Sequence, residues 1–240
     1  MTDTTTTWGE VQGRTITFPM EVEELRAATV LWSVPAATAA ALLPGDAFEV
    51  VEVGPGTAQL VIAACDYVRN PWGDYDELNL GFLARPTGAP PEVIGSFVYR
   101  MPVNQEFTCE AGNRVMGFPK TVEDLTVSCT DATATFRLAM GGRHVLTLTV
   151  PRAAPAGDPS RVEATSYSYL DGIPYGTDLS MDMGTGMIDP ADVVLELGDS
   201  PVADELRSLG LPCPPDFATW GEDLSATFLL GQPIDDVQDL

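Results

Sequence analysis

Lysine and histidine are almost absent from this sequence. Of its 12 basic residues all but one are arginine, so Lys120 is the only lysine, and His144 is the only histidine. A single histidine excludes zinc sites built from several histidines, and any Ser-His-Asp or Cys-His arrangement would have to include His144. Because His144 lies between a turn and a predicted strand, we expect a strand-end residue rather than a catalyst. Chemistry that needs a lysine side chain has only Lys120 to use.

Positive charge is scarce as a whole. The chain carries 35 aspartates and glutamates against 12 lysines and arginines, which gives a formal net charge of −23. Such a charge repels polyanions and anionic membrane surfaces. We therefore expect neither a nucleic-acid partner nor a membrane partner.

Long apolar runs and paired cysteines are also missing. The longest apolar stretch, residues 34–44, is shorter than the ~20 residues that cross a bilayer. The N-terminus lacks the basic and apolar regions of a secretory signal, and the four cysteines form no C-x-x-C pair. We expect structural thiols in a reducing environment, no metal site and a cytoplasmic protein.

Strand character, in contrast, recurs along the chain. Short segments alternate apolar residues with Thr, Ser or Glu and are separated by Gly, Pro, Asn and Asp, which is the pattern of half-buried strands. These segments are residues 15–18, 29–34, 48–53, 59–64, 78–83, 94–99, 125–129, 132–140 and 145–150.

Helical signals are few. A proline start and a Pro-Gly stop bracket residues 35–43, and residues 202–209 end before a glycine. Residues 104–113 begin at a capping asparagine, Asn104, and are expected to end at Gly112. Three short helices among many strands favour an α+β, mostly β domain built on an antiparallel sheet or barrel.

The domain boundaries follow from the same patterns. No internal repeat and no linker divides the 240 residues. We predict a flexible lead-in over residues 1–12, a single domain over residues 13–234 and an acidic tail over residues 235–240.

The only lysine follows a segment that has the composition of packed chain. Met116, Phe118 and Pro119 precede Lys120, whereas an exposed lysine usually has polar neighbours. Burial disfavours the charged ammonium form, and Schiff-base formation with a carbonyl requires a neutral amine. The alternative is a lysine at a loop edge whose stem packs while its charged end reaches water.

An acidic cluster precedes one of the predicted strands. Asp74, Asp76 and Glu77 surround Tyr75 directly before residues 78–83. A carboxylate at such a junction can act as a general acid or base. The alternative is a solvated acidic turn in an acidic chain.

Together these two segments resemble the acetoacetate decarboxylase superfamily. Gly117-Phe118-Pro119-Lys120 is similar to the family segment that carries the Schiff-base lysine, and Tyr75-Asp76-Glu77 is similar to the segment that carries the active-site glutamate. The resemblance implies an antiparallel β barrel or cone with a few short helices. It also implies a covalent imine in place of a cofactor, and assembly as a homo-oligomer.

The same resemblance implies roles for individual residues. Lys120 would be the nucleophile, and Glu77 would orient the adduct or move a proton. Side chains beside the substrate would be Tyr75, Phe118, Met116 and Arg26, with Arg26 holding a substrate carboxylate.

Three positions depart from the family pattern. Thr121 stands where the decarboxylases have a second lysine, and Leu60 aligns with a further family glutamate. Arg26 lies one residue out of register with the carboxylate-binding arginine. The substitutions at Thr121 and Leu60 predict a less charged pocket.

The predicted function is therefore that of a Schiff-base lyase acting on a β-keto acid or a related ketone through Lys120. An aldolase-dehydratase or cyclase of specialised metabolism would use the same lysine and is the first alternative. The second is a barrel that binds a small ligand without catalysis. The methionines at 181, 183 and 187 are expected to pack in the interior or line the pocket.

Overall fold

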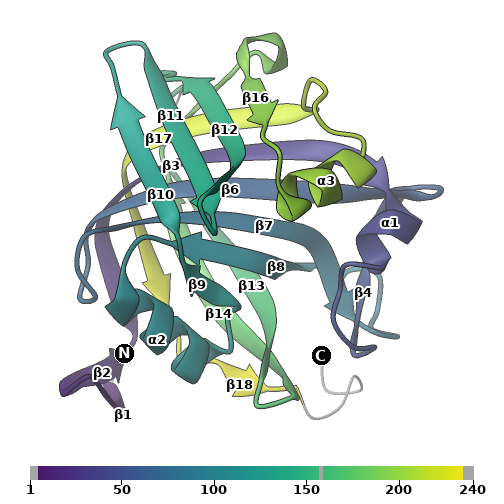
Figure 1. Ribbon diagram of the computed structural model, residues 1–240. Coiled ribbons are helices and arrows are strands. Elements are labelled where there is room, and N and C mark those ends of the chain that lie inside the picture. The colour runs from purple at the N-terminus through teal and green to yellow at the C-terminus, as the bar shows by residue number, and fades with distance from the viewer. Residues whose placement is uncertain (1–4, 157–158, 235–240) are drawn as a thin grey trace.

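A computed structural model describes residues 5–156 and 159–234, and seven long strands form a closed barrel at its centre (Figure 1). Neighbouring barrel strands are antiparallel, except that β8 and β13 pair in parallel, and the pairing of β14 with β17 closes the ring. The mostly β prediction is confirmed. In ring order the strands are β3 (Met20–Pro35), β6 (Thr57–Arg69), β7 (Tyr75–Pro86), β8 (Gly95–Val103), β13 (Ser160–Leu170), β14 (Ile173–Met183) and β17 (Phe217–Phe228).

Short strands extend the edges of the barrel. β9 pairs in parallel with β8 and therefore continues the sheet beside the predicted lysine segment. The short strands are β4 (Phe48–Val50), β5 (Glu52–Gly54), β9 (Lys120–Val122), β15 (Thr185–Met187) and β18 (Gln232–Pro233).

A second, four-stranded sheet covers one side of the barrel (Figure 1). The main hydrophobic core lies between this sheet and the barrel, and it contains Trp32, Phe82, Phe136 and Trp220. The sheet consists, in spatial order, of β10 (Asp124–Cys129), β11 (Thr133–Met140), β12 (Arg143–Pro151) and β16 (Val194–Leu197).

Alternation along the barrel strands separates this core from the barrel interior. On β6, Leu60 and Ile62 are fully buried in the core, whereas Val61 and Ala63 line an interior cavity. Since successive side chains of a strand point to opposite faces, each barrel strand serves both regions. The cavity described below is therefore the inner face of the same strands that build the core.

The three predicted helices are present, with shifted boundaries. They are α1 (Ala36–Ala40), α2 (Glu106–Met116) and α3 (Pro201–Ser208). The side chain of Gln105, rather than Asn104, caps α2 by accepting a bond from the Thr108 N–H. The helix also runs past Gly112 and ends at Gly117, whose φ of 65° is in the left-handed region that favours glycine.

Half of the predicted lead-in forms a strand. Thr6–Val11 form β1, which pairs with β2 (Arg14–Phe18) as a hairpin next to α2. Residues 1–4 and the predicted acidic tail, 235–240, lie outside the described residues. The hairpin buries Val11, Ile16 and Phe18 in a second hydrophobic cluster, separate from the main core. This burial explains why the segment is ordered.

Two expectations from composition concern cysteines and membrane spans. Cys65, Cys109, Cys129 and Cys213 are all free thiols. No helix within residues 5–156 and 159–234 is long and apolar enough to cross a membrane.

Candidate active site

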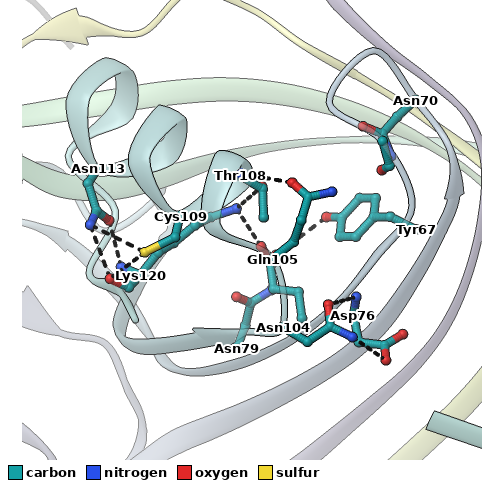
Figure 2. A network of polar contacts seen from close by, with 12 residues as sticks. Tyr67, Asn70, Asp76, Asn79, Asn104, Gln105, Thr108, Cys109, Asn113 and Lys120 are labelled. Atoms are coloured by element: carbon teal, nitrogen blue, oxygen red, sulfur yellow. Dashed lines mark hydrogen bonds and ion pairs between the residues drawn. The ribbon is translucent and has the colours of Figure 1, made fainter. Parts of the chain in front are cut away.

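The main chain of Lys120 is held at the start of β9 by helix α2. The Asn113 side chain donates a hydrogen bond from Nδ2 to the Lys120 carbonyl (3.1 Å) and accepts one at Oδ1 from the Lys120 N–H (2.8 Å). The Cys109 thiol contacts the same carbonyl at 3.4 Å. Figure 2 shows both side chains gathered around Lys120 from one face of the helix. This arrangement fixes the point from which the lysine side chain enters the interior.

The stem of Lys120 crosses α2 at Gly112. A Cβ atom on residue 112 would lie 2.7 Å from both Cδ and Cε of Lys120, which is closer than carbon atoms can approach. The absence of a side chain at Gly112 therefore makes the channel through which the lysine reaches inward. This is the physical reason for a glycine in the middle of a helix, where it otherwise costs stability.

The amine at the end of that stem is buried and paired with Glu77. Lys120 Nζ lies 2.7 Å from Glu77 Oε2, and the two side chains are 3% and 5% exposed. Nζ also donates to Thr108 Oγ1 at 3.1 Å. The alternative of a lysine that reaches water at a loop edge does not fit this geometry, and neither does a solvated acidic turn for Glu77.

Neutral donors surround the other carboxylate oxygen of Glu77. Asn79 Nδ2 donates to Oε1 at 3.1 Å, and the Tyr67 hydroxyl lies 3.5 Å from the same atom. Burial raises the pKa values of the Tyr67 and Tyr75 phenols well above the ordinary value, and the nearby Glu77 carboxylate raises them further. Both phenols are thus neutral, and their rings stack with centroids 4.5 Å apart.

A cavity of about 230 Å³ inside the barrel is bordered by Glu77. All seven barrel strands contribute to its walls, which are mostly apolar. Phe118, which precedes Lys120 by two residues, belongs to the walls. So does Met101, the residue of β8 that pairs with Lys120 of β9. Glu77 thus contacts both the cavity and the amine, while Lys120 itself is not a wall residue.

The predicted substrate-side residues take different places. Phe118 lines the cavity. The Tyr75 ring centroid lies 5.1 Å from Nζ, so this side chain contacts the amine rather than the cavity. Met116 is buried in the core beneath α2 and does not line the cavity.

Arg26 is not brought to the cavity. Its neighbours Leu25 and Ala27 line the cavity, so alternation along β3 turns Arg26 to the other face. There its guanidinium pairs with Asp66 at 2.9 Å. The geometry therefore does not support the carboxylate-binding role that the resemblance implies for Arg26.

The two departures from the family pattern also lie away from the cavity. Leu60 is fully buried in the main core, and Thr121 is exposed. Glu77 is the only charged wall residue within the described chain. Of the three methionines, Met181 and Met183 line the cavity and Met187 is 61% exposed.

Several functional contacts were not predicted from the sequence. Tyr67 and Asn79 flank Glu77, Thr108 contacts the amine, and Asn113 holds the lysine main chain. Only the alternation of β6 and β7 offered a signal, because it places Tyr67, Glu77 and Asn79 on one face. His144, as expected, lies near a strand end: it is the second residue of β12 in the second sheet, and its Nε2 is hydrogen-bonded to Thr147 Oγ1.

Comparison with known families gives one match. The family model described as acetoacetate decarboxylase matches residues 5–212. No curated protein sequence matches the chain significantly.

Solved structures resemble the chain over nearly its whole length. An acetoacetate decarboxylase from Legionella pneumophila is 16% identical with a TM-score of 0.66, and the alignment covers 91% of this chain and 88% of that one. The enduracididine biosynthesis enzyme MppR, solved with pyruvate, is 14% identical with a TM-score of 0.63 and coverage of 92% of both chains. An acetoacetate decarboxylase-like enzyme from Sphingomonas wittichii is 15% identical, with a TM-score of 0.53 and coverage of 88% and 91%. These likenesses show the fold.

Proposed function

The chain belongs to the acetoacetate decarboxylase family, and on that premise we propose that it is a lyase whose Lys120 forms a Schiff base with a β-keto acid or a related ketone. The observation that carries this proposal is the buried pair of Lys120 and Glu77, 2.7 Å apart at the end of an apolar cavity. Lys120 is the only residue of this protein whose side chain carries an amine. A lysine buried among apolar groups is the form in which this residue acts as a nucleophile.

The chemistry begins with a proton transfer within the pair. Glu77 Oε2 accepts a proton from Nζ, which leaves a neutral amine and a neutral carboxylic acid. The amine lone pair then bonds to the carbonyl carbon. The carbonyl oxygen leaves as water with one proton from the amine and one from Glu77, which is again a carboxylate beside a protonated imine.

The protonated imine then serves as an electron sink. From a β-keto acid, the bond to the carboxylate breaks, carbon dioxide leaves, and the electron pair forms an enamine. Protonation of the enamine carbon and addition of water release the shortened ketone and restore Lys120. Tyr67 and Asn79, as neutral donors to Glu77, keep its carboxylate oriented during both proton transfers.

Access to the amine depends on Glu77. Its carboxylate contacts Nζ and also borders the cavity. Once it has accepted the proton, the attraction between the two charges is gone, and the side chain is free to turn away from the amine. The same proton transfer thus activates the nucleophile and opens the path to it.

A second candidate is an aldolase, dehydratase or cyclase that uses the same enamine. One observation favours it, namely the absence of any cationic side chain from the cavity walls within the described residues. MppR has been solved with the condensation product of pyruvate and imidazole 4-carboxaldehyde, which is consistent with carbon–carbon bond chemistry in this fold.

Reductive trapping tests the proposal. The protein is incubated with acetoacetate, acetone or methyl hexyl ketone and with pyridine borane, an uncharged hydride donor, and the modified peptide is identified by mass spectrometry. We expect the reduced ketone adduct on Lys120. The α-amine of residue 1 is the only other primary amine in the chain and reports non-specific reaction in the same sample.

Two results would argue against Schiff-base chemistry. One is modification confined to the α-amine with every carbonyl compound, and the other is trapping at Lys120 no faster than in the urea-unfolded protein. Either would leave the third interpretation, a barrel that binds a small ligand without catalysis. The Glu77→Gln variant, which keeps the amine but lacks the proton acceptor, should trap at least about tenfold more slowly.

A further inference from the structure

The cavity of this protein has a polar end that offers negative or neutral atoms and no positive one. Glu77 carries the only charge in the walls within residues 5–156 and 159–234. Asn79 directs Nδ2 to Glu77, and its buried Oδ1 has no partner among the described protein atoms. Both are wall residues whose oxygens are hydrogen-bond acceptors, and the neutral Tyr67 hydroxyl is a donor.

The remaining walls are mostly apolar, and their polar side chains are the neutral hydroxyls of Thr29, Ser96, Ser166 and Ser225. Strands on opposite sides of the cavity contribute Leu25, Val61, Leu179, Met181, Leu224 and Phe228. Each methylene group that such walls bury adds up to about fourfold to affinity. The cavity thus binds a ligand with a hydrocarbon substituent more tightly than one without it.

The arginine next to the wall residues of β3 is already engaged in an ion pair. Arg26 lies on the outer face of β3 and pairs with Asp66 at 2.9 Å. A carboxylate placed in the cavity would lose its hydration, meet Glu77 and find no cationic partner in the walls. Burial of an unpaired charge is strongly unfavourable.

We propose that the substrate of this site is an uncharged ketone or aldehyde with an apolar substituent, and that free keto acids are excluded. The inference rests on the proposed Schiff-base function and narrows its substrate class. Lys120 Nζ bonds to the neutral carbonyl carbon, water leaves, and the apolar substituent extends from Glu77 along the walls. Without a carboxylate to lose, the resulting enamine is used for carbon–carbon bond formation or cleavage, or for dehydration.

A pair of compounds that differ in one charge tests this directly. Levulinate and methyl levulinate contain the same methyl ketone, but only levulinate is an anion. Trapping with pyridine borane is followed at Lys120, and the α-amine of residue 1 in the same sample corrects for intrinsic reactivity. We expect methyl levulinate to modify Lys120 at least about tenfold faster than levulinate, because only the anion meets Glu77 without a counter-charge.

An engineered cation supplies the matched control. Met181 lines the cavity and is only partly buried, so Met181→Arg introduces a positive charge there and Met181→Gln a neutral polar group. This variant should trap levulinate faster relative to the ester, whereas Met181→Gln should leave the wild-type ratio unchanged. A shift that is equal in both variants would contradict the role given to charge.

Different experimental results would overturn the two proposals. Trapping of levulinate at Lys120 as fast as the ester, or faster, would overturn the neutral-substrate inference and leave the Schiff-base function intact. An absence of any adduct at Lys120 would overturn both.

Discussion

Lys120 and Glu77 neutralise each other in an apolar interior, so neither side chain can be removed alone without cost. The pair is 2.7 Å apart and almost fully buried. Removing one partner of a buried pair typically costs about 3–5 kcal/mol, because the other charge is left unpaired. We therefore expect Lys120→Met to lower the free energy of unfolding by about 3–5 kcal/mol, as measured by urea denaturation at neutral pH.

The double variant separates charge from packing. Glu77→Gln combined with Lys120→Met leaves no buried charge and should recover most of the lost stability. If Lys120→Met were as stable as the wild type, the pair would not be the isolated buried ion pair described above.

Asp76, on the outer face of β7, predicts a pH dependence of stability. Burial, and then the neighbouring carboxylates Asp66 and Asp74, raise the pKa of Asp76 from 3.8 to about 6. A raised carboxyl pKa means that the folded state binds the proton more tightly than the unfolded state between these values. The contribution of Asp76 to the free energy of unfolding is therefore largest below about pH 4 and is lost as the pH rises through 6.

Asp76→Asn isolates that contribution. The Asn104 Nδ2 donor, 2.8 Å from the Asp76 carboxylate, can still bond an amide oxygen. The stability of the variant relative to the wild type should therefore increase between pH 4 and pH 7, as measured by urea denaturation at each pH. A difference that stays constant across this range would refute the assignment.

Helix α2 is the element that positions Lys120, and Gly112 is its critical residue. Alanine favours a helix interior over glycine by about 1 kcal/mol, so Gly112→Ala should fold. Its Cβ would nevertheless meet Cδ and Cε of Lys120 at 2.7 Å and displace the amine. We expect trapping of ketones at Lys120 to slow by about 10–100-fold, because small displacements of a reacting group have effects of this size.

A second glycine provides the control for that variant. Gly54 lies in β5, and a Cβ on it would have no atom within 4 Å. Gly54→Ala should therefore trap at the wild-type rate. Equal rates for Gly112→Ala and the wild type would show that the stem of Lys120 does not depend on the space at residue 112.

The elements were predictable where one face of a strand is apolar and the other polar. The segment 78–83 meets this condition, because the polar Asn79 lines the cavity between the core residues Leu78 and Leu80. Strands β13 and β14 were not predicted. Their cavity-facing positions include Ala164, Ser166 and the partly exposed Leu179, so the two faces barely differ and the alternation is weak.

The candidate site was predictable at Lys120 and Glu77 and not around them. Lys120 stood out by scarcity, and both side chains stood out by the family resemblance. The Asn113 contact, by contrast, depends on how α2 docks on β9, which leaves no pattern in the sequence. Gly112 was interpreted as a helix end because local sequence cannot distinguish a cap from a close approach between distant segments.

The net charge of the whole molecule, like the cavity, disfavours an anionic ligand. Ten of the eleven arginines form ion pairs with carboxylates, and Arg14 lies 3.8 Å over the Phe107 ring. Few positive groups are therefore free to attract an anion to a protein with a net charge of −23. The paired arginines are Arg26, Arg69, Arg85, Arg100, Arg114, Arg137, Arg143, Arg152, Arg161 and Arg207.

Salt distinguishes this long-range repulsion from the local exclusion at Glu77. The Debye length falls from about 30 Å at 0.01 M salt to about 3 Å at 1 M, and buried charges are screened much less than exposed ones. The trapping rate of levulinate at Lys120, divided by that of methyl levulinate, should therefore rise several-fold across this range of salt and still remain below one. The rise would report the surface charge, and the remaining deficit would report Glu77. Because pyridine borane is uncharged, salt does not alter the approach of the reductant. A ratio that falls with salt would mean that a cation attracts the carboxylate, contrary to the charge distribution described above.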